Sequence, residues 1–145
     1  MKRKKYLQQL YYPHNRNKYT GKIPIRTRSS WEFKFAQFLD ANPKILEWSF
    51  ESLWITYYHP GKKRPAKYLP DFWVRTANDI FVIEIGNHSL KTIRSPSRSK
   101  NAKTRAYANM MRIVNEAKFQ AAEEYCSSKG WKFKVVTEKQ MFQYE

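Results

Sequence analysis

Two carboxylates that lie in otherwise apolar segments are the residues of this sequence best suited to chemistry. Asp71 lies early in residues 68–74, and Glu84 lies within residues 81–85. Both segments are short and rich in aromatic and β-branched residues, which predicts neighbouring strands joined by a turn at residues 76–79. A carboxylate in an apolar strand is costly unless it is paired or binds a metal. Two of them on adjacent strands therefore indicate a cation site.

Glu32 and Glu51 are two further acidic residues with a structural and a functional interpretation. Ser29 and Glu32 have the spacing of a capping box, in which the glutamate reaches back to a backbone N–H at the start of a helix. Glu32 also borders the buried stripe of that helix, so that it could face inward and join Asp71 and Glu84. Glu51 begins a predicted strand, either as an outer carboxylate of the site or simply as a polar strand end.

The charge of the chain points to a polyanionic partner. The 145 residues include 28 Lys+Arg against 12 Asp+Glu, which gives a net charge of +16 and a pI of about 10.0. Hydrophobic residues make up 41% and aromatic residues 17% of the chain, so it is expected to fold rather than to remain a disordered polycation. Nucleic acid is the simplest partner. A basic surface kept for solubility and an anionic membrane are the alternatives.

Basic residues gather in three segments. Residues 1–27 form an N-terminal arm in which lysines and arginines alternate with tyrosines, the materials of a nucleic-acid arm or of an extended segment packed on the domain. The turn at residues 59–65 and the loop that follows Glu84 are the other two. The expected DNA contacts are Lys62, Lys63, Arg64, Lys67, Arg94, Arg98, Lys100 and Lys103.

Several classes of protein are disfavoured by what the sequence lacks. Cys126 is the single cysteine, so neither an intrachain disulfide nor a cysteine zinc cluster is expected. The histidines are not at metal-ligand spacing, so no zinc site is expected. No apolar run reaches the roughly 18 residues of a membrane span. No apolar signal core follows the basic N-terminus, so the protein is expected inside a cell.

The predicted elements describe an α/β (α+β) fold. A helix is expected from residue 29 or 30 to before Pro43, then strands at 44–50, 53–58, 68–74 and 81–85. A long helix or a broken pair of helices at 101–129, a strand at 131–136 and a short terminal helix follow. This order predicts a central mixed sheet flanked by helices, with the last strand parallel to its partner. The expected organisation is an arm at 1–27 and one domain at 28–145.

Pro70-Asp71, twelve intervening residues and Glu84, on an αβββαβ core, resemble the PD-(D/E)xK or restriction-endonuclease-like superfamily. The chain further resembles the head-completion nucleases of T4-like tailed phages. The matching stretches are residues 28–32, 39–43, 68–73, 83–85 and 136–138, with Asn115, Lys118, Ala121 and Ala122. This resemblance implies a nuclease that acts on DNA ends or branched DNA during phage head completion. It also implies DNA and head–tail connector proteins as partners, and a location in the host cytoplasm and the virion.

The resemblance assigns roles to individual residues. Asp71, Glu84 and the backbone carbonyl of Ile85 would hold Mg²⁺ or Mn²⁺, whose preferred ligands are oxygens. Glu32 would hold a water on that ion or a second ion. The ion would act as a Lewis acid in phosphodiester hydrolysis.

The sequence departs from the superfamily pattern two residues after Glu84, where Gly86 replaces the lysine. Three explanations are open: Lys91, His88 or Lys67 replaces the lysine; the chain has been inactivated; or it binds DNA without cutting it. His88 in a polar loop is also simply solvated in the plainer interpretation. A structural virion protein and a site-specific homing or restriction endonuclease are the alternatives to a head-completion nuclease.

Overall fold

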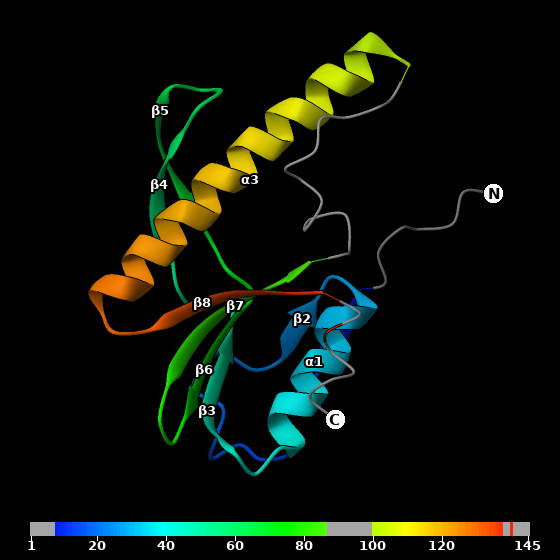
Figure 1. The fold of residues 1–145 in the computed structure, drawn as a ribbon. Coiled ribbons are helices and arrows are strands. Elements are labelled where there is room, and N and C mark those ends of the chain that lie inside the picture. Colours follow the sequence, from blue (N-terminus) through cyan, green and yellow to red (C-terminus); the bar gives the residue numbers. More distant parts are fainter. Residues whose placement is uncertain (1–7, 87–99, 138–139, 141–145) are drawn as a thin grey trace, which may run out of the picture.

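A computed structural model describes residues 8–86, 100–137 and 140 (Figure 1). Its elements in chain order are β1 (Gln9–Tyr11), β2 (Ile25–Thr27), α1 (Ser30–Ala41), β3 (Ile45–Phe50), β4 (Ile55–His59), β5 (Arg64–Tyr68), β6 (Phe72–Thr76), β7 (Ile80–Gly86), α3 (Ala102–Ser128) and β8 (Lys132–Thr137).

The central sheet has the strand order β3-β6-β7-β8. Strand β6 is antiparallel to both β3 and β7, whereas β8 is parallel to β7, with Glu84 opposite Val135 and Gly86 opposite Thr137. A parallel neighbour requires a long crossover, and α3 supplies it. The predicted mixed sheet and parallel last strand are confirmed.

The sheet is covered by different elements on its two faces (Figure 1). Phe35 and Leu39 of α1 pack with Phe72 and Ile83 in one hydrophobic cluster. On the other face, α3 and the β4–β5 hairpin form a second cluster. Because side chains alternate along a strand, Glu84 faces the α3 side when Ile83 faces α1.

The chain between residues 64 and 76 differs from the prediction. Residues 68–74 are not one strand, since β5 ends at Tyr68 and β6 begins at Phe72. Pro70 lacks an N–H and restricts the residue before it, which favours a break there. Asp71 therefore precedes β6 instead of lying within a strand. The predicted turn at 59–65 is shorter, and β5 pairs with β4 in a separate two-stranded sheet.

The described part of the basic N-terminal arm packs on the fold. Tyr11 and Tyr19 are buried in the first cluster. Tyr11 donates a 2.7 Å hydrogen bond to the buried carboxylate of Asp40. The Lys18 ammonium donates to the carbonyls at the end of α1, from Leu39, Asp40 and Asn42, at 2.8–3.0 Å. The Lys18 ammonium thus caps the end of α1 and is bound within the protein.

Two further features concern membrane-spanning helices and the C-terminal end of the described chain. No helix among the described residues is long and apolar enough to cross a bilayer. The backbone N–H of Thr137 donates to Gln140 Oε1 at 3.1 Å, but most of the short terminal helix predicted after Thr137 lies outside the described residues.

Candidate metal centre

Three carboxylates from separate elements converge at one end of the sheet. Glu32 comes from the first turn of α1, Glu51 directly follows β3, and Asp71 directly precedes β6. One carboxylate oxygen from each lies within 4.8 Å of the others. The sequence predicts Glu32 and Asp71 as site residues, and the structure brings them together with Glu51.

Glu32 takes part in helix capping and in this cluster at the same time. Its backbone N–H donates to Ser29 Oγ at 3.1 Å, and its carboxylate accepts from the Ser29 hydroxyl and the Arg28 N–H. These bonds begin α1 as a capping box does, although the backbone N–H comes from the residue before the cap. Capping fixes where the Glu32 carboxylate lies and leaves it beside Asp71.

Glu51 is held in the cluster by an unusual backbone conformation. Its φ is +48°, a left-handed value that costs a non-glycine residue energy. Its N–H donates to the Asp71 carbonyl at 2.8 Å, and its carboxylate pairs with Arg28 at 3.2 Å. Burial raises the pKa of Glu51, the Arg28 charge opposes the rise, and the Glu32 charge adds to it. A left-handed residue after a strand has no clear signature in sequence, so the sequence left Glu51 open as an outer carboxylate of the site or a polar strand end.

Asp71 and Glu84 are both half-buried, and the pKa of each is raised. Asp71 Oδ2 accepts a 2.7 Å hydrogen bond from the Ile85 N–H, which ties the start of β6 to β7. Burial, followed by the charges of Glu84 and Glu32, holds the pKa of Asp71 well above its usual range. Glu84 does not belong to the cluster of three described carboxylates, but its charge acts on Asp71.

Glu84 is oriented by a residue of the hairpin. Tyr68, at the end of β5, donates a 2.7 Å hydrogen bond to Glu84 Oε2. Burial raises the pKa of Glu84 to about 7, against the opposing effects of hydrogen bonds from Tyr68 and the Asp71 backbone and of the Lys118 charge. Glu84 therefore titrates close to neutral pH.

The donor set fits a hard divalent cation. Carboxylate oxygens are the ligands that Mg²⁺ and Ca²⁺ take in proteins. Acidic groups crowded together with raised pKa values repel one another when ionised, and a bound cation removes that repulsion. These described residues could thus hold a metal ion, whereas the carbonyl of Ile85 stays a predicted ligand.

The position of the missing lysine lies on the same sheet face as Glu84. Gly86 ends β7 two residues after Glu84, so both face α3. Among the predicted substitutes, the Lys67 ammonium donates to Thr56 Oγ1 at 2.8 Å on the hairpin, while Lys91 and His88 lie outside the described residues. Lys118 of α3, which sequence reasoning did not assign to the site, carries the positive charge that acts on Glu84.

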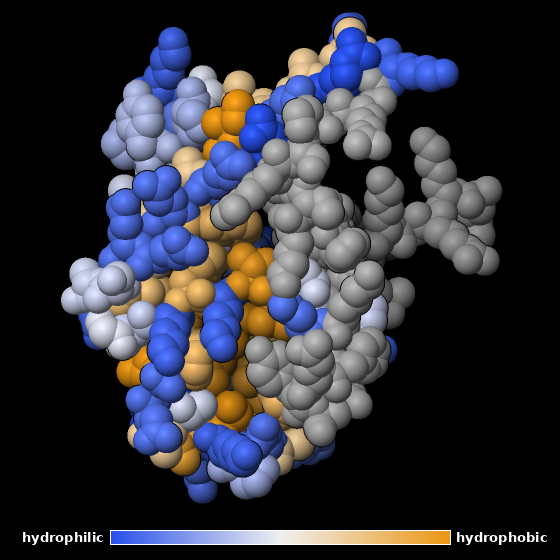
Figure 2. Space-filling model, in the orientation of Figure 1, coloured by the Kyte–Doolittle hydropathy of each residue, from blue (hydrophilic) through white to orange (hydrophobic). Residues whose placement is uncertain are grey.

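The predicted DNA contacts fall in two described places. Lys62, Lys63 and Arg64 are exposed at the hairpin tip and Lys67 is exposed on β5, whereas Lys100 and Lys103 are exposed at the start of α3. A Cβ at Gly61 would meet Met110 Sδ of α3 at 3.1 Å, so this glycine permits close packing of the turn on the helix. Hydrophilic side chains gather over the hairpin and over the start of α3 (Figure 2). Arg94 and Arg98 lie outside the described residues.

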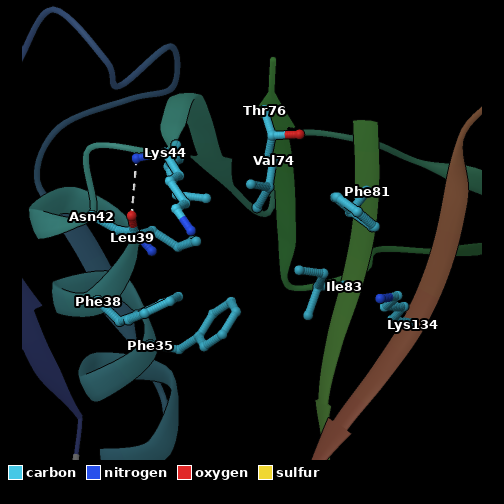
Figure 3. Close-up of a pocket in the computed structure, with 11 residues that line it drawn as sticks. Phe35, Phe38, Leu39, Asn42, Lys44, Val74, Thr76, Phe81, Ile83 and Lys134 are labelled. Carbon is cyan, nitrogen blue, oxygen red and sulfur yellow. Dashed lines mark hydrogen bonds between the residues drawn. The ribbon is translucent and has the colours of Figure 1, made fainter. Parts of the chain in front are cut away.

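An apolar cavity of about 190 Å³ lies between α1 and strands β6 and β7 (Figure 3). Phe35 and Phe38 approach it from the helix, and Phe81 and Ile83 from β7. None of the described residues that line it is acidic. The cavity is on the α1 face of the sheet, away from the face to which Glu84 points, and does not form part of the candidate metal centre.

Comparisons with known proteins show what the chain is similar to. The family described as TnsA-like endonuclease N terminal matches residues 42–138, which include Asp71 and Glu84. The chain is 31% identical over 135 residues to the head completion nuclease of Enterobacteria phage T4, covering 88% of this chain and 89% of that protein. No solved structure matches the chain.

Proposed function

We propose that this chain, which belongs to the family of TnsA-like endonucleases, is a divalent-metal-dependent endonuclease that hydrolyses phosphodiester bonds in DNA. The observation that carries the proposal is the convergence of Glu32, Glu51 and Asp71 within 4.8 Å, beside a Glu84 whose charge acts on Asp71. Glu32, Glu51 and Asp71 each have a structural contact of their own, but ionised together they repel one another unless a cation binds between them.

Different residues of the site would bind the ion, position the carboxylates and bind the DNA phosphates. Asp71 and Glu84 would bind Mg²⁺ or Mn²⁺, together with Glu32, Glu51 and the Ile85 carbonyl. When bound, such an ion polarises the scissile phosphate and activates the attacking water. The Ile85 N–H and the Tyr68 hydroxyl hold the Asp71 and Glu84 carboxylates in place. The exposed lysines and arginines of the hairpin and of α3 would bind DNA phosphates on either side of the scissile phosphate.

The biological setting follows from the relative. Similarity to a phage head completion nuclease supports a role in finishing phage heads by processing DNA ends or branches, in the host cytoplasm and in the virion. Head–tail connector proteins would then be partners. The basic elements offer phosphate contacts rather than readout of base edges, which favours recognition of DNA shape over sequence.

Cleavage of linear, flapped and branched DNA in Mg²⁺ or Mn²⁺ tests the proposal. The parent chain should cut when the ion is present, and Asp71→Asn should lose cutting by at least about 100-fold. Asp79→Asn is the matched control, because Asp79 pairs with Lys132 at the far end of β7. Equal cutting by the parent and Asp71→Asn would overturn the assignment of the site.

A second candidate function rests on Gly86. With no lysine at this position, the chain could be a DNA-binding virion protein that has lost cleavage. This alternative predicts tight DNA binding without cutting in either ion, by the parent and by Gly86→Lys alike.

A further inference from the structure

Lys118 interrupts the buried stripe of α3. The helix buries Val114, Ala122 and Cys126, and Lys118 lies four residues after the first and four before the second. Residues at this spacing share one helix face. Lysine is rarely placed on such a face unless its charge has a partner. The sequence pattern and the burial therefore both require a reason for a lysine here.

Lys118 lies close to Tyr68, which in turn contacts Glu84 of the candidate metal centre. Its ammonium lies 5.7 Å from the centroid of the Tyr68 ring and 5.9 Å from that of Tyr57. Both tyrosines are buried. The Tyr68 hydroxyl donates to Glu84 Oε2 at 2.7 Å. Lys118 also acts electrostatically on Glu84 itself.

We propose that Lys118, projecting from α3, supplies at Glu84 the positive charge that a lysine at position 86 supplies in related nucleases. This inference rests on the proposed function. Gly86 and Glu84 lie on the sheet face that α3 covers. A lysine on the helix and a lysine at position 86 can therefore both interact electrostatically with the Glu84 carboxylate. Lys118 offsets the negative charge where a DNA phosphate meets the acidic cluster, and the chain needs no lysine in the motif itself.

A structural role for Lys118 is the competing explanation, since its contacts with Tyr57 and Tyr68 also join α3 to the hairpin. The two roles differ in what replaces the residue. Charge compensation can be provided from position 86, whereas ring contacts cannot. Removal of a cation from the site also strengthens divalent-ion binding, because like charges repel, whereas loss of a packing contact does not.

The test compares the parent, Lys118→Met, Gly86→Lys and the double variant, with cleavage and Mn²⁺ affinity measured for each. Lys129→Met is the matched control. Lys129 also lies over two rings, those of Tyr125 and Trp131, but eleven residues further on, roughly 16 Å along a helix axis.

We expect Lys118→Met to lose cleavage on the order of 100-fold and to bind Mn²⁺ several-fold more tightly than the parent. The double variant should recover most of the cleavage, and Lys129→Met should match the parent in both measurements. Full cleavage by Lys118→Met, or cleavage by Gly86→Lys alone with a silent parent, would overturn the inference and leave the nuclease function standing. Silence of all variants, with Mn²⁺ affinity that Asp71→Asn does not change, would instead overturn the proposed function.

Discussion

Tyr68 and Glu84, sixteen residues apart in the chain, meet through a 2.7 Å hydrogen bond in which the phenol donates to Oε2. The bond connects a hairpin outside the central sheet to an acidic residue on the β7 strand. The position of Glu84 therefore depends on the packing of the β4–β5 hairpin against α3.

Tyr68→Phe removes this hydrogen bond and keeps the ring. We expect the free energy of unfolding to fall by about 1 kcal/mol and single-turnover cleavage to fall on the order of 10-fold, because Glu84 loses the group that orients it. Urea unfolding and cleavage assays measure the two effects. Tyr125→Phe removes a hydroxyl from the same hydrophobic cluster and should leave cleavage unchanged; equal losses in the two variants would count against the role of Tyr68.

The pKa of Glu84 gives a stability profile with a defined sign. This pKa is 4.5 ordinarily and about 7 in the folded protein, so the folded state retains its proton while the unfolded state loses it. The contribution of Glu84 to stability is therefore full below pH 4.5 and lost as the pH rises through 7, by at most about 3 kcal/mol without a divalent ion. Asp71 acts in the same direction.

Thermal unfolding in EDTA at several pH values between 4 and 8 measures this loss, and Mg²⁺ or Mn²⁺ should restore stability at pH 8. Glu84→Gln should reduce the slope between pH 4.5 and 7, and the slope that remains should come from Asp71. A parent protein that is equally stable at pH 5 and pH 8 in EDTA would show that these carboxylates are not crowded.

The buried Asp40 and the half-buried Asp71 should respond to substitution in opposite ways. Burial raises the pKa of Asp40, but hydrogen bonds from Tyr11, His14 and Asn15 outweigh it, so that its pKa is below the ordinary 3.8. We expect Asp40→Ala to cost about 3 kcal/mol, whereas Asp71→Asn should stabilise the ion-free protein at pH 8. Denaturant unfolding of both variants decides the matter; destabilisation by Asp71→Asn would contradict this prediction.

Glu51 holds a strained backbone beside like charges, and glycine relieves both. We expect Glu51→Gly to raise the stability of the ion-free protein by about 1 kcal/mol and to lower Mn²⁺ affinity about 10-fold or more. Calorimetric titration and unfolding curves test the pair of effects. Glu47→Gln, on β3 and paired with Arg75 at 2.6 Å, is the control for charge and should leave the affinity unchanged.

The hairpin tip should contribute to DNA affinity through phosphate contacts. Replacement of Lys62, Lys63 and Arg64 by alanine should reduce the slope of log affinity against log salt by about 2 to 3, at roughly 0.9 per lost phosphate contact. Fluorescence anisotropy at several salt concentrations measures the slope. An unchanged slope would place the DNA elsewhere on the protein.

The sequence predicted those elements and site residues that depend on local patterns, and missed those that depend on tertiary packing. β7 and α3 have clear periodicities, and Asp71 and Glu84 stand out within apolar surroundings. Strand β5 was missed because Arg64, Pro65 and Lys67 lack apolar alternation, and because it pairs with β4 in a separate two-stranded sheet. Lys118 comes near Glu84 through the tertiary arrangement, because the residues around it, Glu84, Tyr68 and Tyr57, lie 34, 50 and 61 residues earlier in the chain.

The central sheet separates the two hydrophobic clusters, so we expect the two layers to open separately when no ion is bound. Glu32 belongs to the layer of α1, whereas Tyr68 belongs to the layer of α3 and the hairpin. An ion that binds at Asp71 and Glu84 would connect the layer of α1 to the layer of α3 and the hairpin. Amide hydrogen exchange should then report two separately opening units in EDTA and a single, more protected unit once the ion is bound.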